Sequence, residues 1–224
     1  MFRNRCDAGQ QLAQKLAKFA TQDPVVLALV RGGLPVGLEV AEALHAPLDI
    51  VLVRKIGAPY QAELAVGAVA DGPEPEVVVN PDILKFVALP AGYVEQEAKA
   101  QLAEIERRSK LYLRNRRRIA IAGKTAIVVD DGIATGATTR AALHAVRRQK
   151  PKRLVLAVPV APQSTIDALR EDADEIACLQ TPEPFHAIGF FYADFHQVSD
   201  EEVISILERA ARSTAKQPSV IDAE

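Results

Sequence analysis

The sequence predicts an α/β protein in which helices flank a parallel β-sheet and a smaller β element is added. Two observations support this fold class. Short runs of apolar residues recur along the 224-residue chain, as expected for strands that are buried on both faces. Most of these runs are followed by a segment with helical periodicity, and this alternation is typical of right-handed crossovers between parallel strands.

The first half of the chain begins with residues 7–19, whose apolar residues recur at helical spacing. PVVLALV (24–30) is apolar throughout and predicts a buried strand. PVGLEVAEALH (35–45) opens with a proline, which suits the first turn of a helix. DIVLV (49–53) predicts the second buried strand.

The middle of the chain differs in character. AELAVGAVA (62–70) and EVVVN (76–80) predict a smaller β element, because the turn-forming stretch DGPEP separates them. A long polar helix is expected at about 93–113. The remaining elements repeat the strand–helix alternation: strand 125–129, helix 137–149, strand 153–158, helix 163–172, strand 175–179 and helix 200–211.

Composition is that of an ordinary globular domain, with 49% apolar and 25% charged residues. We expect a single domain over residues 1–212 and a polar tail over 213–224. The net charge of −2 provides no general attraction to nucleic acid or anionic membranes. No apolar run has transmembrane length, and the N-terminus lacks a signal-peptide core. We therefore expect a cytoplasmic protein with Cys6 and Cys178 as reduced thiols; a disulfide between them is the alternative.

Three unusual segments follow predicted strands. Arg31-Gly32-Gly33 comes after the first strand, Arg54-Lys55 after the second and DDGIATGATT (130–139) after the third. In an open parallel sheet, ligands bind beyond the carboxyl ends of the strands. These three segments should therefore meet at one edge of the sheet.

The segment 130–139 has a readable chemistry. It leads into a predicted helix, whose first N–H groups would bind a phosphate, and Gly136 permits a positive φ. Asp130 and Asp131 would repel that phosphate, so they must face hydrogen-bond donors or positive charge. Vicinal sugar hydroxyls and hydrated Mg²⁺ both fit, and a phosphate close to a diol describes a ribose 5-phosphate.

Residues 127–138, IVVDDGIATGAT, resemble the phosphoribosyl diphosphate signature of type I phosphoribosyltransferases. Arg31-Gly32-Gly33 resembles the short pyrophosphate-binding loop of that family, in which a cis peptide occurs. Arg54-Lys55 resembles a basic pair beside the diphosphate. RGGLPVG, VRKIGAP, ELAVGAV and PEPF…DFHQVSDEEV resemble a little-characterised bacterial subgroup, although Val30 stands where that subgroup is expected to have proline.

The resemblance implies the type I phosphoribosyltransferase fold, with a hood subdomain formed by about 62–80, by 181–195 or by both. It implies transfer of ribose 5-phosphate from phosphoribosyl diphosphate to a nitrogen acceptor, expected to be a nucleobase, with Mg²⁺ and as a homodimer. Mg²⁺ should bridge substrate oxygens, with no direct protein ligand or with Asp130 and Asp131 acting through water. The implied roles are as follows: catalysis by Asp130, Asp131 and Lys55; 5-phosphate binding by Thr135, Gly136, Ala137, Thr138 and Thr139; pyrophosphate binding by Arg31, Gly32, Gly33 and Arg54.

Two other functions remain open at this stage. One is a regulator that senses a phosphoribosyl ligand and binds RNA or protein; the other is a hydrolase that uses water as the acceptor. The basic run RRSKLYLRNRRR (107–118) could be a solvated helix end, a lid or an RNA site. The acidic net charge and the scarcity of aromatic residues argue against nucleic acid as a partner.

Overall fold

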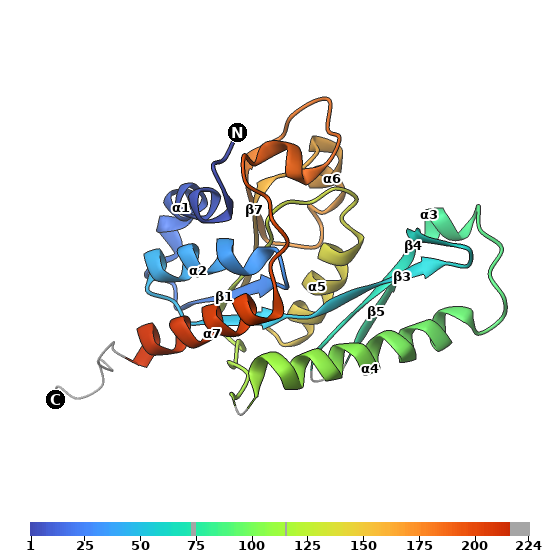
Figure 1. The fold of residues 1–224 in the computed structure, drawn as a ribbon, viewed down its shortest axis with the longest axis horizontal. Helices are drawn as coiled ribbons and strands as arrows, with labels where there is room; N and C mark the ends of the chain where they lie inside the picture. Colours follow the sequence, from blue (N-terminus) through green and yellow to red (C-terminus); the bar gives the residue numbers. More distant parts are fainter. Residues whose placement is uncertain (73–74, 115, 216–224) are drawn as a thin grey trace.

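The computed structural model describes residues 1–72, 75–114 and 116–215, which form a five-stranded sheet, a three-stranded sheet and the helices that cover them (Figure 1). The larger sheet is parallel, with the strand order β2-β1-β6-β7-β8. Its strands are β1 (Pro24–Leu29), β2 (Leu48–Val51), β6 (Thr125–Val129), β7 (Arg153–Val160) and β8 (Glu175–Gln180). The predicted parallel α/β core is confirmed.

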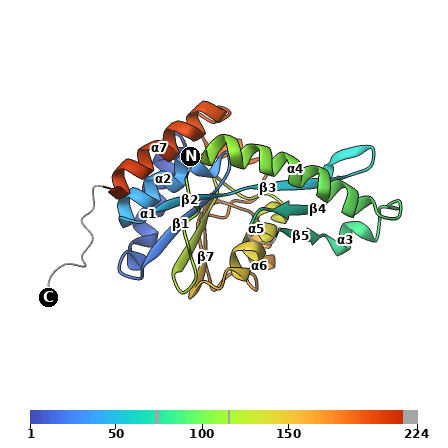
Figure 2. The same ribbon diagram turned by 90° about the horizontal axis from the view of Figure 1, so that it is seen from below.

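Helices cover both faces of this sheet (Figure 2). Val26 and Ala28 of β1 face one core, with α1 (Arg5–Leu16), η1 (Ala17–Phe19), α2 (Gly33–Leu44) and α7 (Asp200–Ala215). Val25 and Leu27 face the other core, with α5 (Ala137–Arg148) and α6 (Gln163–Ala168). This alternation explains the uniformly apolar strand sequence, because both faces of β1 are buried.

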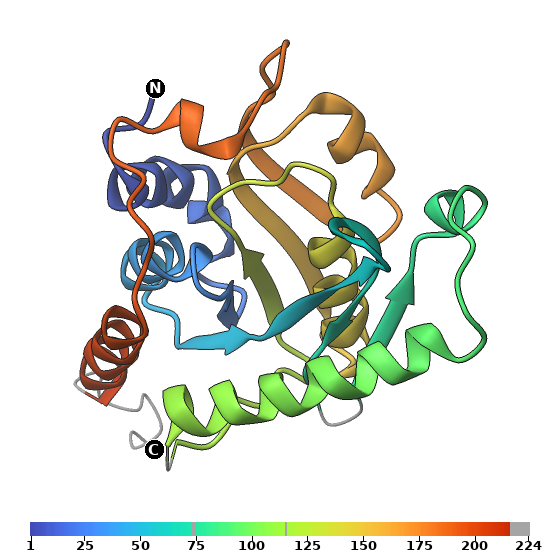
Figure 3. The same ribbon diagram turned by 45° about the vertical axis from the view of Figure 1, so that its right-hand side comes forward.

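The smaller sheet is antiparallel and extends away from the core (Figure 3). It contains β3 (Val53–Ala58), β4 (Gln61–Ala70) and β5 (Glu76–Val79), followed by α3 (Pro81–Leu84) and α4 (Tyr93–Leu113). One face packs on Ala98 of α4, and the other packs on Ala141 and Ala145 of α5. The predicted β element at 62–80 is confirmed within the described residues, but β3 was missed: Arg54-Lys55 lies in a strand rather than in a loop.

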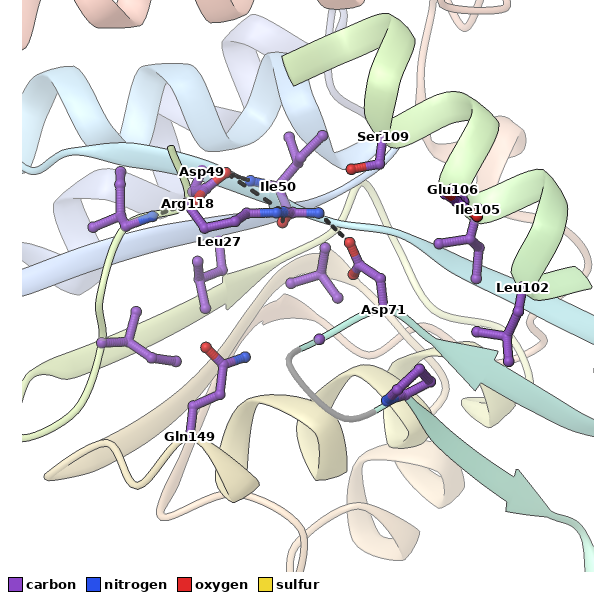
Figure 4. Close-up of a pocket in the computed structure, with 15 residues that line it drawn as sticks. Leu27, Asp49, Ile50, Asp71, Leu102, Ile105, Glu106, Ser109, Arg118 and Gln149 are labelled. Carbon is purple, nitrogen blue, oxygen red and sulfur yellow. Dashed lines mark hydrogen bonds and ion pairs between the residues drawn. The ribbon is translucent and has the colours of Figure 1, made fainter. Parts of the chain in front are cut away.

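The two sheets join where Leu52 meets Asp71. The Asp71 amide donates to the Leu52 carbonyl oxygen at 2.9 Å, and the Leu52 amide donates to Oδ1 of Asp71 at 2.8 Å. Arg118 links this junction to the core by contacting Asp71, the Ile50 carbonyl and Asp49, beside a cavity of about 540 Å³ (Figure 4). The hood is therefore connected to the core sheet through a small polar junction.

The C-terminal helix is longer than predicted, because α7 continues to Ala215. Residues 216–224 of the predicted tail, and residues 73–74 of the predicted turn, lie outside the described residues. Among the described helices, none is both long and apolar enough to span a membrane.

Candidate active site

The loops after β1 and β6 touch one another at the carboxyl edge of the sheet. A Cβ atom on Gly32 would lie 2.1 Å from Oδ2 of Asp131, and one on Gly33 would lie 2.6 Å from the Val129 carbonyl oxygen. Only glycine permits such an approach. The peptide between Val30 and Arg31 is cis. The prediction that the loop at Arg31–Gly33 lies beside Asp130 and Asp131 is therefore confirmed.

The segment after the acids leads into an open helix N-terminus. Gly136 has φ +80° and precedes α5, which has no side-chain cap. The first N–H groups of α5 are thus left for a ligand, and anions bind well at such a position. Thr165 of α6 steadies the loop by donating its hydroxyl to the Ala134 carbonyl oxygen at 2.7 Å. The positive φ predicted for Gly136 is confirmed.

The three threonines of this segment are not equivalent. Thr135 is exposed and Thr138 is half-buried, so both present hydroxyl groups near the surface. Thr139 is only 1% exposed. Its side chain packs inside the protein. The part of Thr139 in 5-phosphate binding therefore stays a prediction.

Asp131 points into the protein. Its Oδ2 atom accepts a hydrogen bond from Nε of Arg5 at 2.8 Å, and both residues are 7% exposed. Nη1 of Arg5 donates to the His196 carbonyl oxygen at 2.7 Å, and the guanidinium lies 3.9 Å from the centre of the Phe195 ring. The Tyr192 hydroxyl donates to the Asp131 carbonyl oxygen at 2.6 Å. Asp131 is therefore held by the N-terminal helix and by the segment after β8.

The two carboxyl groups have unusual titration properties. Burial raises the pKa of Asp130 well above its usual range, and the negative charge of Asp131 raises it further. The Asp131 amide opposes this by donating to Oδ1 of Asp130 at 2.9 Å. Burial also raises the pKa of Asp131, but the Arg5 guanidinium opposes that shift. The pair thus favours a ligand that donates hydrogen bonds or carries positive charge, and the half-buried Asp130 is the one placed to meet it.

Arg54 and Lys55 lie on opposite faces of β3. Lys55 pairs across the sheet with Ala68, whose face packs on α5. Arg54 instead donates from Nε to Oε1 of Gln101 on α4 at 3.0 Å. The predicted basic pair is therefore divided: Lys55 lies on the face directed toward α5, whereas Arg54 is directed toward α4.

A cavity of about 520 Å³ lies between this part of the hood and the first turn of α5. It is bounded by β3, by Tyr93, Glu97 and Gln101 of α4, and by Thr138. Arg54 and Lys55 both contribute to this wall, so the two cations border one cavity although they lie on opposite faces of β3. Lys55 of β3 and Thr138 in the first turn of α5 thus border the same cavity.

Arg31 is anchored by residues that were not predicted for the site. Its Nη1 atom lies 3.3 Å from Oδ1 of Asp200, the first residue of α7. The same oxygen accepts the hydroxyl of Tyr112 at 2.6 Å. No sequence signal indicated Arg5 or Tyr192. Asp200 lies in a segment that carried the subgroup resemblance, which was the only available indication.

The two candidate hood segments border different parts of the site. Residues 62–80 contribute the sheet beside Lys55 and α5. Residues 181–195 cover the acids, since a Cβ on Gly132 would lie 2.6 Å from Cγ2 of Ile188 in η2 (Ile188–Phe191). Phe190 of this turn is 69% exposed. Both segments therefore flank the candidate site.

The basic run 107–118 is largely paired within the protein. Arg107 and Arg108 bind Glu104, and Arg114 binds Glu208. Arg116 donates to the Leu207 carbonyl oxygen, and Arg118 joins the hood junction. These contacts favour the helix-end interpretation of this run over a lid or an RNA site.

A family model, two curated proteins and a solved structure are each similar to most of this chain. The phosphoribosyl transferase domain family matches residues 4–195. Two curated Mycobacterium tuberculosis proteins, "Putative phosphoribosyl transferase MT0597" and "Putative phosphoribosyl transferase Rv0571c", are each 45% identical over 216 residues. That alignment covers 96% of this chain and 48% of each relative, so this chain spans about half of their length. The crystal structure of TT1426 from Thermus thermophilus has 42% identity and a TM-score of 0.80, covering 93% of this chain and 98% of that one.

Proposed function

Because this chain belongs to the phosphoribosyl transferase domain family, we propose that it transfers the ribose 5-phosphate group of phosphoribosyl diphosphate to a nitrogen acceptor. The contact between the acidic doublet and the RGG loop, beside an uncapped helix N-terminus, is the observation that carries this proposal. Such a site offers acids for a diol and N–H groups for a phosphate within one edge of the sheet.

In the proposed reaction, the bond from C1 of the ribose to the pyrophosphate oxygen breaks. A bond from C1 to the acceptor nitrogen forms, and the acceptor loses a proton if it carries one. C1 becomes cation-like as the leaving group departs, as in glycoside hydrolysis. Asp130 accepts hydrogen bonds from the ribose hydroxyls and favours this positive charge. Arg5, which donates to Asp131 at 2.8 Å, favours the ionised form of that carboxyl group beside it.

The phosphate groups would be divided between two parts of the site. The α5 N-terminus, with Thr135 and Thr138, binds the 5-phosphate. Arg31, the Gly32–Gly33 backbone and Lys55 neutralise the departing pyrophosphate. Positive charge near this leaving group is needed because negative charge develops on its bridging oxygen as the bond to C1 breaks.

Mg²⁺ fits this arrangement as a companion of the substrate. Among the described residues, no group of three or more His, Cys, Asp or Glu side chains is gathered to hold a metal. The carboxylate oxygens of Asp130 and Asp131 are the hard ligands available, acting through water, and phosphate oxygens would supply the remainder. When bound, Mg²⁺ would lower the charge of the diphosphate.

The acceptor would lie beneath residues 181–195. Phe190 is exposed on η2, which lies next to Gly132, and the ring of His186 is 6.1 Å from that of Phe190. A nucleobase could stack on this aromatic pair, and this is the reason for proposing a nucleobase as the nitrogen acceptor.

The test is to incubate the protein with Mg²⁺ and phosphoribosyl diphosphate and to follow pyrophosphate release with a panel of purine and pyrimidine bases. We expect release that depends on one class of base and on Mg²⁺. Equal release with and without a base would instead identify a hydrolase. Binding of phosphoribosyl diphosphate without release in any mixture would favour a sensor of this ligand.

A further inference from the structure

We infer that Asp200 is a positioning residue that holds Arg31 in place for the pyrophosphate group, an inference that rests on the proposed function. Oδ1 of Asp200 is shared by the Tyr112 hydroxyl at 2.6 Å and by Nη1 of Arg31 at 3.3 Å. Tyr112 is 2% exposed, and the Arg31 side chain is 25% exposed. A buried hydroxyl therefore fixes the carboxylate, and the carboxylate restrains a partly exposed guanidinium.

Asp200 is itself set in place by the start of α7. The Ser199 amide donates to Oε2 of Glu202 at 2.7 Å, and the Glu202 amide donates to Oγ of Ser199 at 3.2 Å. This reciprocal pair is a capping box. Because Ser199 and Glu202 cap the helix, the carboxylate of Asp200 is left to bind Tyr112 and Arg31.

The protonation states support the same arrangement. The Tyr112 hydrogen bond and the nearby positive charge of Arg31 lower the pKa of Asp200, so this carboxylate is ionised at neutral pH. Burial and the negative charge of Asp200 raise the pKa of Tyr112 to about 12, so this hydroxyl remains a donor. Both partners thus keep the required form across the physiological range.

The charge of Asp200 does not cancel the cationic character of the region. Arg107 and Arg108 lie close enough to interact electrostatically with Asp200, and both bind Glu104. Arg31, Arg107 and Arg108 carry three positive charges, whereas Asp200 and Glu104 carry two negative charges, so this group has a net charge of +1. A guanidinium has five N–H donors, so Arg31 can bind Asp200 and still present other donors to pyrophosphate.

The inference is tested by calorimetric binding of inorganic pyrophosphate in the presence of Mg²⁺, using the full chain. Asp200→Asn keeps an oxygen that can accept from Tyr112 but removes the charge that holds Arg31. We expect the dissociation constant of pyrophosphate to rise about three- to tenfold, the factor associated with ordering one long side chain on binding. Ribose 5-phosphate should bind as in the wild type, because its site is at α5.

Two further variants separate positioning from other effects. Glu201→Gln removes an equal charge from an exposed neighbour on the first turn of α7 and should leave pyrophosphate binding unchanged. Tyr112→Phe keeps the charge of Asp200 but removes its anchor, and should weaken pyrophosphate binding in the same direction as Asp200→Asn. Melting temperatures of all variants report any general loss of structure.

The outcomes distinguish the inference from the proposed function. Equal pyrophosphate affinity in Asp200→Asn and the wild type overturns the inference and leaves the proposed function standing. Tighter binding in Asp200→Asn also overturns it, because Asp200 would then compete with the ligand. Parallel loss of pyrophosphate and ribose 5-phosphate binding would indicate a structural role and contradict positioning. If neither ligand binds to the wild type, the proposed function itself fails.

Discussion

Replacing Gly32 with alanine tests the contact between the two loops directly. Gly32 has φ −60° and ψ −36°, a conformation that alanine adopts without strain. The obstacle is Asp131, because the new Cβ would lie 2.1 Å from its Oδ2 and 2.7 Å from its Cγ. Asp131 cannot move away freely, since Arg5 holds the same oxygen at 2.8 Å.

The expected cost follows from these contacts. Restricting the unfolded chain by a glycine-to-alanine change would alone stabilise the protein by about 0.4–1 kcal/mol. Overpacking typically costs about 1–3 kcal/mol, and separating Arg5 from Asp131 would cost about 3–5 kcal/mol as for other buried ion pairs. After subtraction of the entropic gain, overpacking alone would leave a cost of about 0–2.6 kcal/mol, and separation of the ion pair would leave about 2–4.6 kcal/mol. We therefore expect Gly32→Ala to lower the free energy of unfolding, by about 2 kcal/mol or more if the ion pair separates.

The assay is urea denaturation followed by circular dichroism, in the wild type and in an Asp131→Ala background. Asp131→Ala is itself destabilising, because Arg5 loses its partner, but it removes the atoms that meet the new Cβ. Adding Gly32→Ala to that background should then be neutral or stabilising. An equal cost of Gly32→Ala in both backgrounds would refute the reasoning, because the cost would not come from Asp131.

Three other predictions concern the candidate site. Lys55→Ala should slow pyrophosphate release at least about tenfold, which corresponds to about 1.4 kcal/mol of activation barrier. Arg54→Ala should slow it less, because Arg54 binds Gln101. Equal effects of the two variants in steady-state kinetics would contradict the division of this pair. Gly136→Val forces a β-branched residue into φ +80° and should raise the dissociation constants of ribose 5-phosphate and phosphoribosyl diphosphate alike; unchanged calorimetric affinities would remove this loop from the site. The raised pKa of Asp130 means that folding takes up a proton, so the wild-type free energy of unfolding should fall as pH rises from about 4, the pKa of an unfolded aspartate, through the raised value. Asp130→Asn should lose that part of the slope and be more stable at neutral pH, as denaturation at a series of pH values would measure; an unchanged slope would argue against burial of the charge.

The core sheet could be predicted because its physical signal is local. Strands buried on both faces are apolar throughout, and a turn or a proline marks the start of the helices between them. β3 was missed because it lacks this continuous apolar signal. Its sequence VRKIGA carries two cations, and the strand lies between α4 and α5 in a hood of mixed polarity. A short strand of this kind has no distinctive pattern.

The candidate site was predictable only in part. Asp130, Asp131 and Gly136 lie in one continuous motif, and the parallel topology brings Arg31–Gly33 to the same edge. Arg5 is 126 residues from its partner Asp131, and nothing near Arg5 in the sequence indicates that pairing. Thr139 is on the buried side of α5, which a motif of consecutive residues cannot reveal.

The length of α4 has a mechanical consequence. Its 21 residues span about 32 Å at 1.5 Å per residue. Near its start, Tyr93 donates its hydroxyl to the Gly57 carbonyl oxygen of β3, and near its end Tyr112 holds Asp200. If α4 moves as a rigid helix, displacement of one end rotates the helix about the point where Ile105 packs in the core. A swing of β3 that repositions Lys55 would thereby also move the anchor of Arg31, so α4 links the positions of these two cations.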